Sequence, residues 1–241
     1  MKAMVLAAGQ GSRLRPLTDT CPKPMLPLGG KPLLEHVITL LAHHGFDEVV
    51  VNLHHLPEQI RAYFGDGSTW GVRLSYSHEE QLLGTAGAVA RMADFFDQPF
   101  LVYYGDNLCN MDLGALWRTH LDRGGIATMG LHRLDDPCRS GIVQLDQDGR
   151  VRRFIEKPRR EQVFPDYQIN CGIYALAPEI LNWIPNLGPS DFGRDIFPRL
   201  LEADQPIYGY PMRGQLLASD TPERYAHAQT QIACGHFALP R

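Results

Sequence analysis

A group of small and basic residues near the N-terminus has the composition of a phosphate site. An apolar segment runs directly into a turn that contains Gly9, Gly11 and Arg13. Glycines in such a turn let backbone N–H groups close around phosphate oxygens, and an arginine adds a planar cation suited to bidentate contact. Lys23 follows between two prolines, which restrict the backbone on either side, so we expect this lysine on a stiff, extended segment that mounts its ammonium group rigidly. The segment therefore predicts a site for a phosphorylated ligand.

Two common phosphate motifs do not fit this turn. The dinucleotide fingerprint needs a third glycine where this chain has Leu14. The P-loop needs Gly-Lys followed by serine or threonine, but Gly30 and Lys31 are followed by Pro32. A plain tight turn remains the alternative for the glycines taken alone.

The first part of the chain alternates between short apolar runs and helical patterns, and this alternation predicts the scaffold that positions the turn. We expect strands over residues 2–7, 48–53, 72–76 and 100–104, and helices over 33–44, 57–64, 85–96 and 113–121. Such a pattern favours a Rossmann-like α/β fold, with a mostly parallel central sheet and helices on both faces. Ligands of these folds collect at the carboxyl ends of the strands, where the glycine-rich turn begins.

The pattern changes after Gly125. Strand-like runs over 126–132, 141–145, 151–155 and 169–175, with Asp148-Gly149 as a hairpin turn, indicate antiparallel strands added to the parallel core. Helices are expected over 192–202 and 222–234. We interpret residues 1–241 as one domain, with a nucleotide-binding half over about 1–125 and a second half over about 126–241.

Composition excludes several classes of protein. The 241 residues carry 23 basic and 27 acidic side chains, a net charge of -4, which argues against nucleic acid as the main partner. The apolar stretch at 3–8 is too short for a signal peptide or a membrane span. The five cysteines include no C-x-x-C pair, as expected for reduced thiols in a cytoplasmic protein.

Several segments together resemble the sugar-1-phosphate nucleotidylyltransferases, also called nucleotide-sugar pyrophosphorylases. The resemblance begins with LAAGQGSRLRP at 6–16 and PKP at 22–24. It continues in the family's order with LGTAG at 83–87, YGDN at 104–107, FIEKP at 154–158, NCGIY at 170–174, DIFP at 195–198 and TPERY at 221–225. It covers essentially the whole chain.

The resemblance implies transfer of a nucleotidyl group from a nucleoside triphosphate to a sugar 1-phosphate, with Mg²⁺ as cofactor. It implies that Arg13 steadies the leaving pyrophosphate, that Lys23 contacts the reacting phosphates, and that Lys157 binds the sugar phosphate. The nucleotide would be bound by Ala8, Gly9, Gly11, Ser12, Arg13, Gln81, Gly84, Thr85 and Gly87. For Gly84 and Gly87, a loop at a helix start is the alternative.

The resemblance also implies a sugar-phosphate site and a metal site. Asp106 follows a buried strand and would be a Mg²⁺ ligand, since Mg²⁺ prefers one or two carboxylates plus phosphate oxygens. A turn or capping role is its alternative. The sugar phosphate would be bound by Asn107, Gly141, Glu156, Lys157, Asn170 and Gly172. For Glu156 and Lys157, an exposed ion pair is the alternative.

One segment departs from the family's pattern. The family usually carries Trp-x-Asp-Ile-Gly-Thr-Pro-Glu, whose aspartate is a second metal ligand, whereas residues 216–223 read LLASDTPE. Ala218 occupies the aspartate position, and Asp220 lies two residues later. Asp220 is a candidate second metal ligand, but capping of the following helix is the favoured interpretation. The departure supports an alternative function, a catalytically impaired protein that binds sugar nucleotides.

The sequence leaves the substrates open. The LGTAG segment resembles the branch that transfers guanylyl groups to mannose or heptose phosphates, whereas YGDN resembles the thymidylyl branch. Guanylyl transfer is slightly favoured, and thymidylyl, uridylyl or cytidylyl transfer to another acceptor is the alternative. The family often forms homodimers, but no residue pattern here specifies an oligomeric state.

Overall fold

The computed structural model describes residues 1–133, 136–185 and 188–238, which form two compact units. The first unit comprises Met1–Leu82, Tyr103–Met111 and Gly214–Arg241, and the second comprises Leu83–Val102 and Asp112–Arg213. Each unit gathers segments that are far apart in the sequence. The interpretation as one domain with halves that meet near residue 125 remains a prediction.

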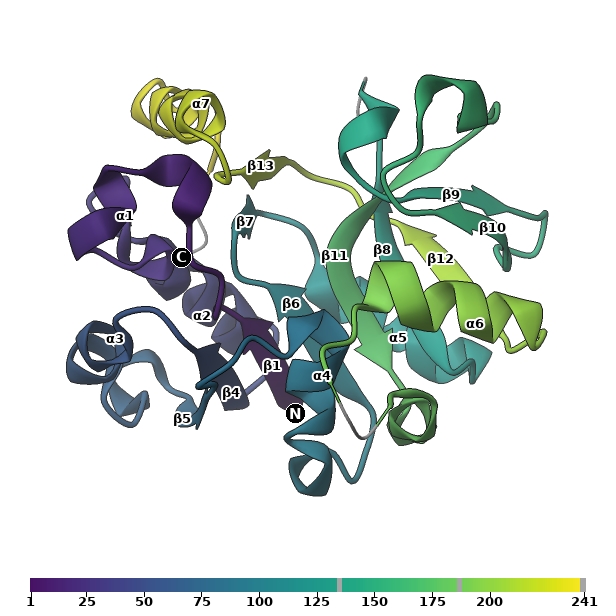
Figure 1. Ribbon diagram of the computed structural model, residues 1–241, viewed down its shortest axis with the longest axis horizontal. Coiled ribbons are helices and arrows are strands. Elements are labelled where there is room, and N and C mark those ends of the chain that lie inside the picture. The colour runs from purple at the N-terminus through teal and green to yellow at the C-terminus, as the bar shows by residue number, and fades with distance from the viewer. Residues whose placement is uncertain (134–135, 186–187, 239–241) are drawn as a thin grey trace. The chain divides into compact units, whose positions relative to one another are not determined.

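Three parallel strands form the sheet within the first unit (Figure 1). They are β1 (Lys2–Leu6), β4 (Glu48–Leu53) and β5 (Arg73–His78), paired in that order. Leu6 lies opposite Asn52, and Asn52 lies opposite Ser77. Five of the six residues of β4 are buried, as expected of a parallel strand that is covered on both faces.

Helices and short elements complete the first unit. The expected spacing of apolar residues produces α2 (Leu33–His43), which ends before Gly45, a glycine with a φ of 79°. The other helices are α1 (Leu17–Thr20), α3 (Pro57–Phe64) and α7 (Pro222–Ala233). Two short strand pairs are β2 (Pro27–Leu28) with β3 (Lys31–Pro32) and β7 (Asn107–Cys109) with β13 (Leu216–Ala218), and 3-10 turns cover Ser12–Leu14, Lys23–Met25 and Ser68–Trp70.

The second unit is built mainly on antiparallel strands (Figure 1). β9 (Ile142–Leu145) and β10 (Val151–Ile155) form the predicted hairpin, and Gly149 in its turn has a φ of 78°. β11 (Gln168–Leu176) runs antiparallel to β8 (Ala127–His132) and to β9. β12 (Ile207–Pro211), which the sequence analysis did not expect, pairs in parallel with β8. β6 (Phe100–Tyr104) contains residues of both units.

The helices of the second unit are α4 (Gly84–Ala90), α5 (Leu113–Arg123) and α6 (Phe197–Glu202). The single helix expected over 192–202 begins instead as a π-helical turn at Phe192–Ile196, in which the Phe197 N–H donates to the Phe192 carbonyl. Pro198 has no N–H to donate to the carbonyl four residues before it, which is consistent with this irregular start. The helix expected over 85–96 is also divided, into α4 and a 3-10 turn at Ala93–Phe95.

The α/β fold class is confirmed, with parallel strands in the first unit and mainly antiparallel strands in the second. Within the described ranges, no helix is long and apolar enough to cross a membrane.

Candidate functional site

The glycine-rich turn begins where β1 leaves its neighbour β4. The Ala7 N–H donates to the side-chain Oδ1 of Asn52 at 2.6 Å. Beyond this contact, Gly9 and Gly11 serve different purposes. A Cβ at Gly9 would have no protein atom within 4 Å, so the fold itself leaves this space open. A Cβ at Gly11 would lie 2.8 Å from Thr18 Cγ2, and its φ is 65°, so the fold requires this glycine.

Asn52 joins the turn to the segment that carries Gln81. Its Nδ2 donates to Glu79 Oε1 at 2.8 Å, and the Glu79 carboxyl group is buried. The Glu79 N–H donates to the Leu53 carbonyl, which holds this segment at the end of β4. Sequence reasoning missed Asn52 and Glu79; the available signal was a polar residue near the end of an otherwise apolar strand.

Lys23 and Asp106 meet at the same end of β1. The Gly105 N–H donates to the Leu6 carbonyl at 2.9 Å, and a Cβ at Gly105 would lie 3.0 Å from that oxygen. This close approach sets the next residue, Asp106, beside the end of β1. Lys23 Nζ lies 3.0 Å from Asp106 Oδ2, although these residues are 83 positions apart in the sequence. Lys23 is only 9% exposed and begins a 3-10 turn rather than an extended segment.

Asp220 lies in the same unit and pairs with two arginines. Its Oδ2 is 2.8 Å from Arg13 Nη1, and its Oδ1 is 2.8 Å from Arg224 Nη1. The expectation that Asp220 caps the following helix is wrong, because Thr221 is the N-cap residue of α7 and accepts from the Arg224 N–H. Burial opposes ionisation of Asp220, but the hydrogen bond from Arg224 and the charges of Arg224, Arg13 and Lys23 outweigh it and lower its pKa.

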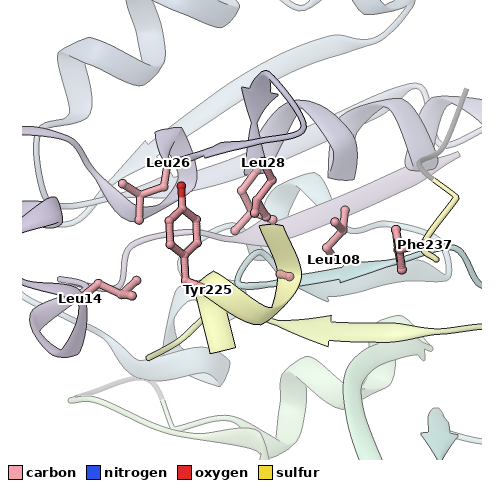
Figure 2. Close-up of a cluster of buried hydrophobic side chains, with 8 residues drawn as sticks. Leu14, Leu26, Leu28, Leu108, Tyr225 and Phe237 are labelled. Carbon is pink, nitrogen blue, oxygen red and sulfur yellow. The ribbon is translucent and has the colours of Figure 1, made fainter. Parts of the chain in front are cut away.

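The C-terminal helix packs on the segments that follow the turn. Tyr225 of α7 lies among Leu14, Leu26 and Leu28 in a buried apolar cluster (Figure 2). Its hydroxyl donates to the Pro27 carbonyl at 2.6 Å. The cluster also contains Leu33, Leu108, Ala228 and Phe237. Leu14, the residue after Arg13, and the segment at 26–28 are therefore held by a helix near the other end of the chain.

The residues around Asp106 suit a metal ion that takes most of its ligands from phosphate groups and water. The Asp106 side chain is 40% exposed and has Lys23 as its ion-pair partner. No group of three or more His, Cys, Asp or Glu side chains is placed to hold a metal in the described part of the chain. One accessible carboxylate, completed by phosphate oxygens and water, is the arrangement that Mg²⁺ commonly accepts. The residues present therefore fit a divalent ion that binds together with a nucleotide.

Glu156 occupies a recess in the second unit. It follows β10, and its Oε2 would lie 2.8 Å from a Cβ at Gly141 and 2.7 Å from one at Gly193. The two glycines therefore make the space for this carboxyl group. Burial raises the pKa of Glu156 above its usual range, and Asp191 raises it further against the opposing charges of Lys157 and Arg194.

Lys157 has an unusual backbone conformation. Its φ is 46°, in the left-handed region that costs a non-glycine residue on the order of 1 kcal/mol. Its N–H donates to the Ser140 carbonyl, and its exposed ammonium group lies 3.9 Å from Glu156 Oε1. This distance is too long for a hydrogen bond, so the ammonium group keeps its capacity to bind an anion.

Asn170 and Gly172 lie in an irregular part of β11, next to the same recess. The Asn170 N–H donates to the Gly141 carbonyl at 2.8 Å. Asn170 Oδ1 accepts from the Gly172 N–H, and its Nδ2 donates to the Tyr174 hydroxyl. Pairing with β8 shifts register between Asn170 and Tyr174, and Gly172 has a φ of 69°. Gly141, Glu156 and Asn170 are thus neighbours in the fold, and their binding of a sugar phosphate stays a prediction.

The packing of the second unit bears on the need for glycine at positions Gly84 and Gly87. Gly84 has a φ of 72°, and a Cβ there would lie 2.4 Å from the Ser190 carbonyl oxygen. The N–H groups of Ala86 and Gly87 donate to that same oxygen. The alternative of a loop at a helix start therefore explains Gly84, whereas Gly87 lies inside α4, and contact of either glycine with a base remains a prediction.

Asp191, which sequence reasoning missed, forms hydrogen bonds that hold the start of α4 in place. Its Oδ2 accepts from the Thr85 hydroxyl, and its Oδ1 accepts from the Gly193 N–H. The Phe192 N–H donates back to Thr85 Oγ1 at 2.9 Å. Because Gly193 lies against Glu156, Asp191 joins a candidate nucleotide residue to the recess. A conspicuous DFGRD segment was the available signal.

The remaining candidate residues are described within the unit to which each belongs. Asn107, predicted to bind the sugar phosphate, belongs to the first unit and pairs with Ala218 between β7 and β13. Ala8 is buried in the turn, and Ser12 begins the 3-10 turn that contains Arg13. Gln81 is exposed and lies in the first unit, whereas Gly84, Thr85 and Gly87 lie in the second.

The chain is similar in sequence to several known proteins. A sequence profile described as nucleotidyl transferase matches residues 2–221. The UTP–glucose-1-phosphate uridylyltransferase of Synechocystis sp. is 40% identical in an alignment of 226 positions that covers 88% of this chain and 58% of that protein. The mannose-1-phosphate guanylyltransferase of Mycobacterium tuberculosis is 36% identical over 99% of this chain and 66% of its own length. The chain thus spans about three-fifths of the length of these curated relatives.

A solved structure shows the same fold. A putative glucose-1-phosphate thymidylyltransferase from Bacillus anthracis superposes with a TM-score of 0.86 at 24% identity. The match covers 95% of this chain and 94% of that one.

Proposed function

The chain belongs to the nucleotidyl transferase family, and from this premise we propose that it transfers a nucleotidyl group from a nucleoside triphosphate to a sugar 1-phosphate. The products are a nucleotide sugar and pyrophosphate. The observation that carries the proposal is the meeting of the open space at Gly9, the Lys23–Asp106 pair and Arg13 in the first unit. Relatives named for uridylyl and guanylyl transfer support it.

The reaction is a displacement at phosphorus. An oxygen of the sugar phosphate forms a bond to the α-phosphorus of the triphosphate, and the bond from that phosphorus to the bridging oxygen of pyrophosphate breaks. Two anions must approach each other, so rate enhancement comes mainly from positioning and charge neutralisation.

The first unit supplies the nucleotide side. Backbone N–H groups of Gly9 and Gly11 bind triphosphate oxygens, and Arg13 holds the pyrophosphate that leaves. Lys23 contacts the reacting phosphates. Its low exposure and its ion pair with Asp106 hold the ammonium group in a fixed position for this contact. We infer Mg²⁺ as the cofactor, held by Asp106 and phosphate oxygens, where it would neutralise charge on the triphosphate.

The second unit supplies the sugar side. Glu156 accepts hydrogen bonds from sugar hydroxyl groups, and Lys157 neutralises the sugar phosphate. Gly141 lies against Glu156, Asn170 is hydrogen-bonded to Gly141, and the Gly172 N–H orients the Asn170 side chain for the same site. The scheme needs no covalent enzyme intermediate, because the two substrates react directly with each other.

For the base and the sugar, we propose guanylyl transfer to mannose or heptose 1-phosphate. Several of the relatives are mannose-1-phosphate guanylyltransferases, while the relative with 40% identity is a uridylyltransferase. Uridylyl, thymidylyl or cytidylyl transfer is the alternative. The reaction is assigned to the cytoplasm, where nucleoside triphosphates are made and the chain's free thiols stay reduced.

Ala218 favours a second candidate function, a binding protein without catalysis. This residue lies opposite Asn107, at the position where the family's pattern has an aspartate.

The test is pyrophosphate release with Mg²⁺ over ATP, GTP, CTP, UTP and dTTP, each combined with a panel of sugar 1-phosphates. We expect one pair to give a clear signal, which identifies both substrates. A blank matrix, from folded protein that still binds a nucleotide by calorimetry, would replace the proposal with the binding protein.

A further inference from the structure

We infer that Asp220 is a positioning residue that holds Arg13 for the triphosphate, rather than a second ligand of the metal. The inference rests on the proposed function, because it assigns Asp220 a part in nucleotide binding. It concerns the position at which this chain departs from the family's pattern, with Ala218 in place of the usual aspartate and Asp220 two residues later.

The contacts of the carboxylate support this role. Each of its oxygens lies 2.8 Å from a guanidinium nitrogen, one of Arg13 and one of Arg224. The Asp220 side chain is 13% exposed, so both contacts are partly shielded from water. Oδ1 accepts a hydrogen bond from Arg224 and Oδ2 is held in an ion pair with Arg13, so both oxygens already face a cationic group, and repulsion between these cations and a metal ion disfavours a metal at this carboxylate.

Asp220 is held firmly on both sides along the chain. The N–H and the hydroxyl of Ser219 donate to the Asp106 carbonyl at 3.2 and 3.1 Å. Thr221 caps α7, and Tyr225 in the same helix is anchored to Pro27. The carboxylate therefore has a fixed place beside the candidate metal ligand.

Arg13 needs such a support. It lies in a 3-10 turn of three residues, and its side chain is 65% exposed. Among the described residues, its ion pair is with Asp220. An exposed arginine loses much rotamer freedom when it binds a phosphate, so a carboxylate that orients it beforehand lowers the entropy cost of binding.

The charges also fit a triphosphate. Asp220, Arg13 and Arg224 together carry one net positive charge, so the carboxylate orients Arg13 without cancelling the attraction of the group for an anion. A carboxylate without Arg224 would neutralise Arg13 completely. The second arginine therefore makes the aspartate compatible with a phosphate site.

The experiment measures nucleotide binding and metal binding separately. Wild-type protein is first tested by calorimetry with ATP, GTP, CTP, UTP and dTTP, and the nucleotide that binds is used throughout. Asp220→Asn, Arg13→Ala and the double variant are then compared in EDTA, where no metal contributes. We expect Asp220→Asn to raise Kd about fivefold in the wild-type background and less than about twofold in the Arg13→Ala background.

Metal affinity gives the second reading. Free Mn²⁺ is measured by electron paramagnetic resonance in the presence of the same nucleotide. We expect Asp220→Asn to leave the Mn²⁺ affinity within about twofold of wild type, and Asp106→Asn to weaken it by at least about tenfold. Glu48→Gln is the matched control, because it removes another carboxylate–guanidinium pair, with Arg73, at the opposite ends of the strands.

The results separate the possible roles. Unchanged or tighter metal-free binding by Asp220→Asn would overturn the inference, as would a loss of Mn²⁺ affinity equal to that of Asp106→Asn. A wild-type protein that binds none of the nucleotides would instead refute the proposed function, before any variant is compared. Thermal unfolding checks each variant, and Asp220→Ser replaces the asparagine variant if that one loses its fold.

Discussion

At the scale of single residues, two carboxylates of the first unit have opposite surroundings. Asp106 is 40% exposed and has one cationic partner, Lys23, whereas Asp220 is 13% exposed and has two. Accessibility to an incoming ion therefore favours Asp106, and fixed contacts favour a structural or orienting part for Asp220. A third carboxylate, Glu156, lies in a recess where burial raises its pKa.

The first prediction compares the two aspartates. Asp106→Ala should reduce kcat by at least about a thousandfold, because it removes the candidate protein ligand of the ion that neutralises the phosphates. Asp220→Ala should reduce kcat by less than about tenfold, because it affects only the orientation of Arg13. Steady-state pyrophosphate release measures both values. Equal losses would mean that Asp220 shares the role of Asp106.

The second prediction concerns Glu156 and pH. Its pKa is raised in the folded protein, so the folded state binds this proton more strongly than the unfolded state does. The resulting stabilisation is complete below the unfolded pKa of about 4.3 and is lost as pH rises through the raised folded pKa. Glu156→Gln should therefore increase Tm at pH 7 relative to wild type, with a difference that shrinks as the pH falls toward 4.

The same substitution should weaken sugar-phosphate binding. Loss of a charged acceptor costs about 1.5–3 kcal/mol, or roughly tenfold to a hundredfold in KM for the sugar 1-phosphate. A variant that is more stable but less able to bind its substrate would support the assigned role. If Tm at pH 7 is lower than that of wild type, the carboxylate makes favourable contacts in the folded state that outweigh its burial.

At the scale of elements, the strand ends determine where the functional turns lie. β1 gives way to the glycine-rich turn where Asn52 binds the Ala7 N–H. In the second unit, the start of α4 is fastened to the Ser190 carbonyl and to Asp191. Both turns contain glycines, but only the space at Gly9 is open, and Gly84 is packed against backbone.

The third prediction uses this contrast. Gly9→Ala should leave Tm within about 2 °C of wild type, because the added Cβ meets no protein atom and Gly9 lies outside the left-handed region. It should weaken nucleotide binding at least about tenfold. Gly84→Ala should cost about 2–4 kcal/mol from its positive φ and overpacking, which corresponds to a loss of roughly 5–15 °C in Tm. Calorimetry and thermal unfolding measure the two effects.

The opposite pattern would change the assignment. A Gly9→Ala protein with normal nucleotide affinity would show that the triphosphate does not approach the turn, and the glycines would then be a plain tight turn. A Gly84→Ala protein with normal stability would mean that the α4 loop moves away from Ser190 easily.

At the scale of the whole molecule, each compact unit carries most of the candidates for one substrate, although the nucleotide candidates at 84–87 lie in the second unit and Asn107 lies in the first. The first unit holds Arg13, Lys23 and Asp106, and the second holds Glu156, Lys157 and Asn170. The first unit also brings α7, from the C-terminal part of the chain, against the segments around Arg13. Binding of each substrate should therefore slow amide hydrogen exchange mainly in the unit that carries most of its candidate residues.

The fourth prediction is a hydrogen-exchange pattern. Nucleoside triphosphate with Mg²⁺ should slow amide exchange over 8–15, and the sugar 1-phosphate should slow it over 156–158 and 170–172. Protection of 84–87 by the nucleotide would also support a contact of that loop with the base. Protection of 156–158 by the nucleotide, with no change over 8–15, would reverse the assignment of the two substrates. Mass spectrometry of peptic fragments provides the measurement.

Much of the scaffold could be predicted because its signals are local. The strands at 48–53, 100–104 and 151–155 and the helix at 57–64 have the expected boundaries, since apolar spacing, prolines and glycines act within a few residues. β12 was missed because its Gly209 and Pro211 weaken the strand signal, and its pairing with β8 depends on residues far along the chain.

The sequence by itself determined the fold class, the glycine-rich turn after the first strand and the resemblance to a family of nucleotidylyltransferases, because these depend on residue types at short spacings. Only the tertiary structure decided the partners of Asp220, the link from Asn52 to Glu79 and the packing reason for Gly84. Each of these joins residues that are distant in sequence, so hydrogen-bond geometry and available space decide them. Asp220 could have capped a helix beside it, but two arginines and Thr221 were better placed.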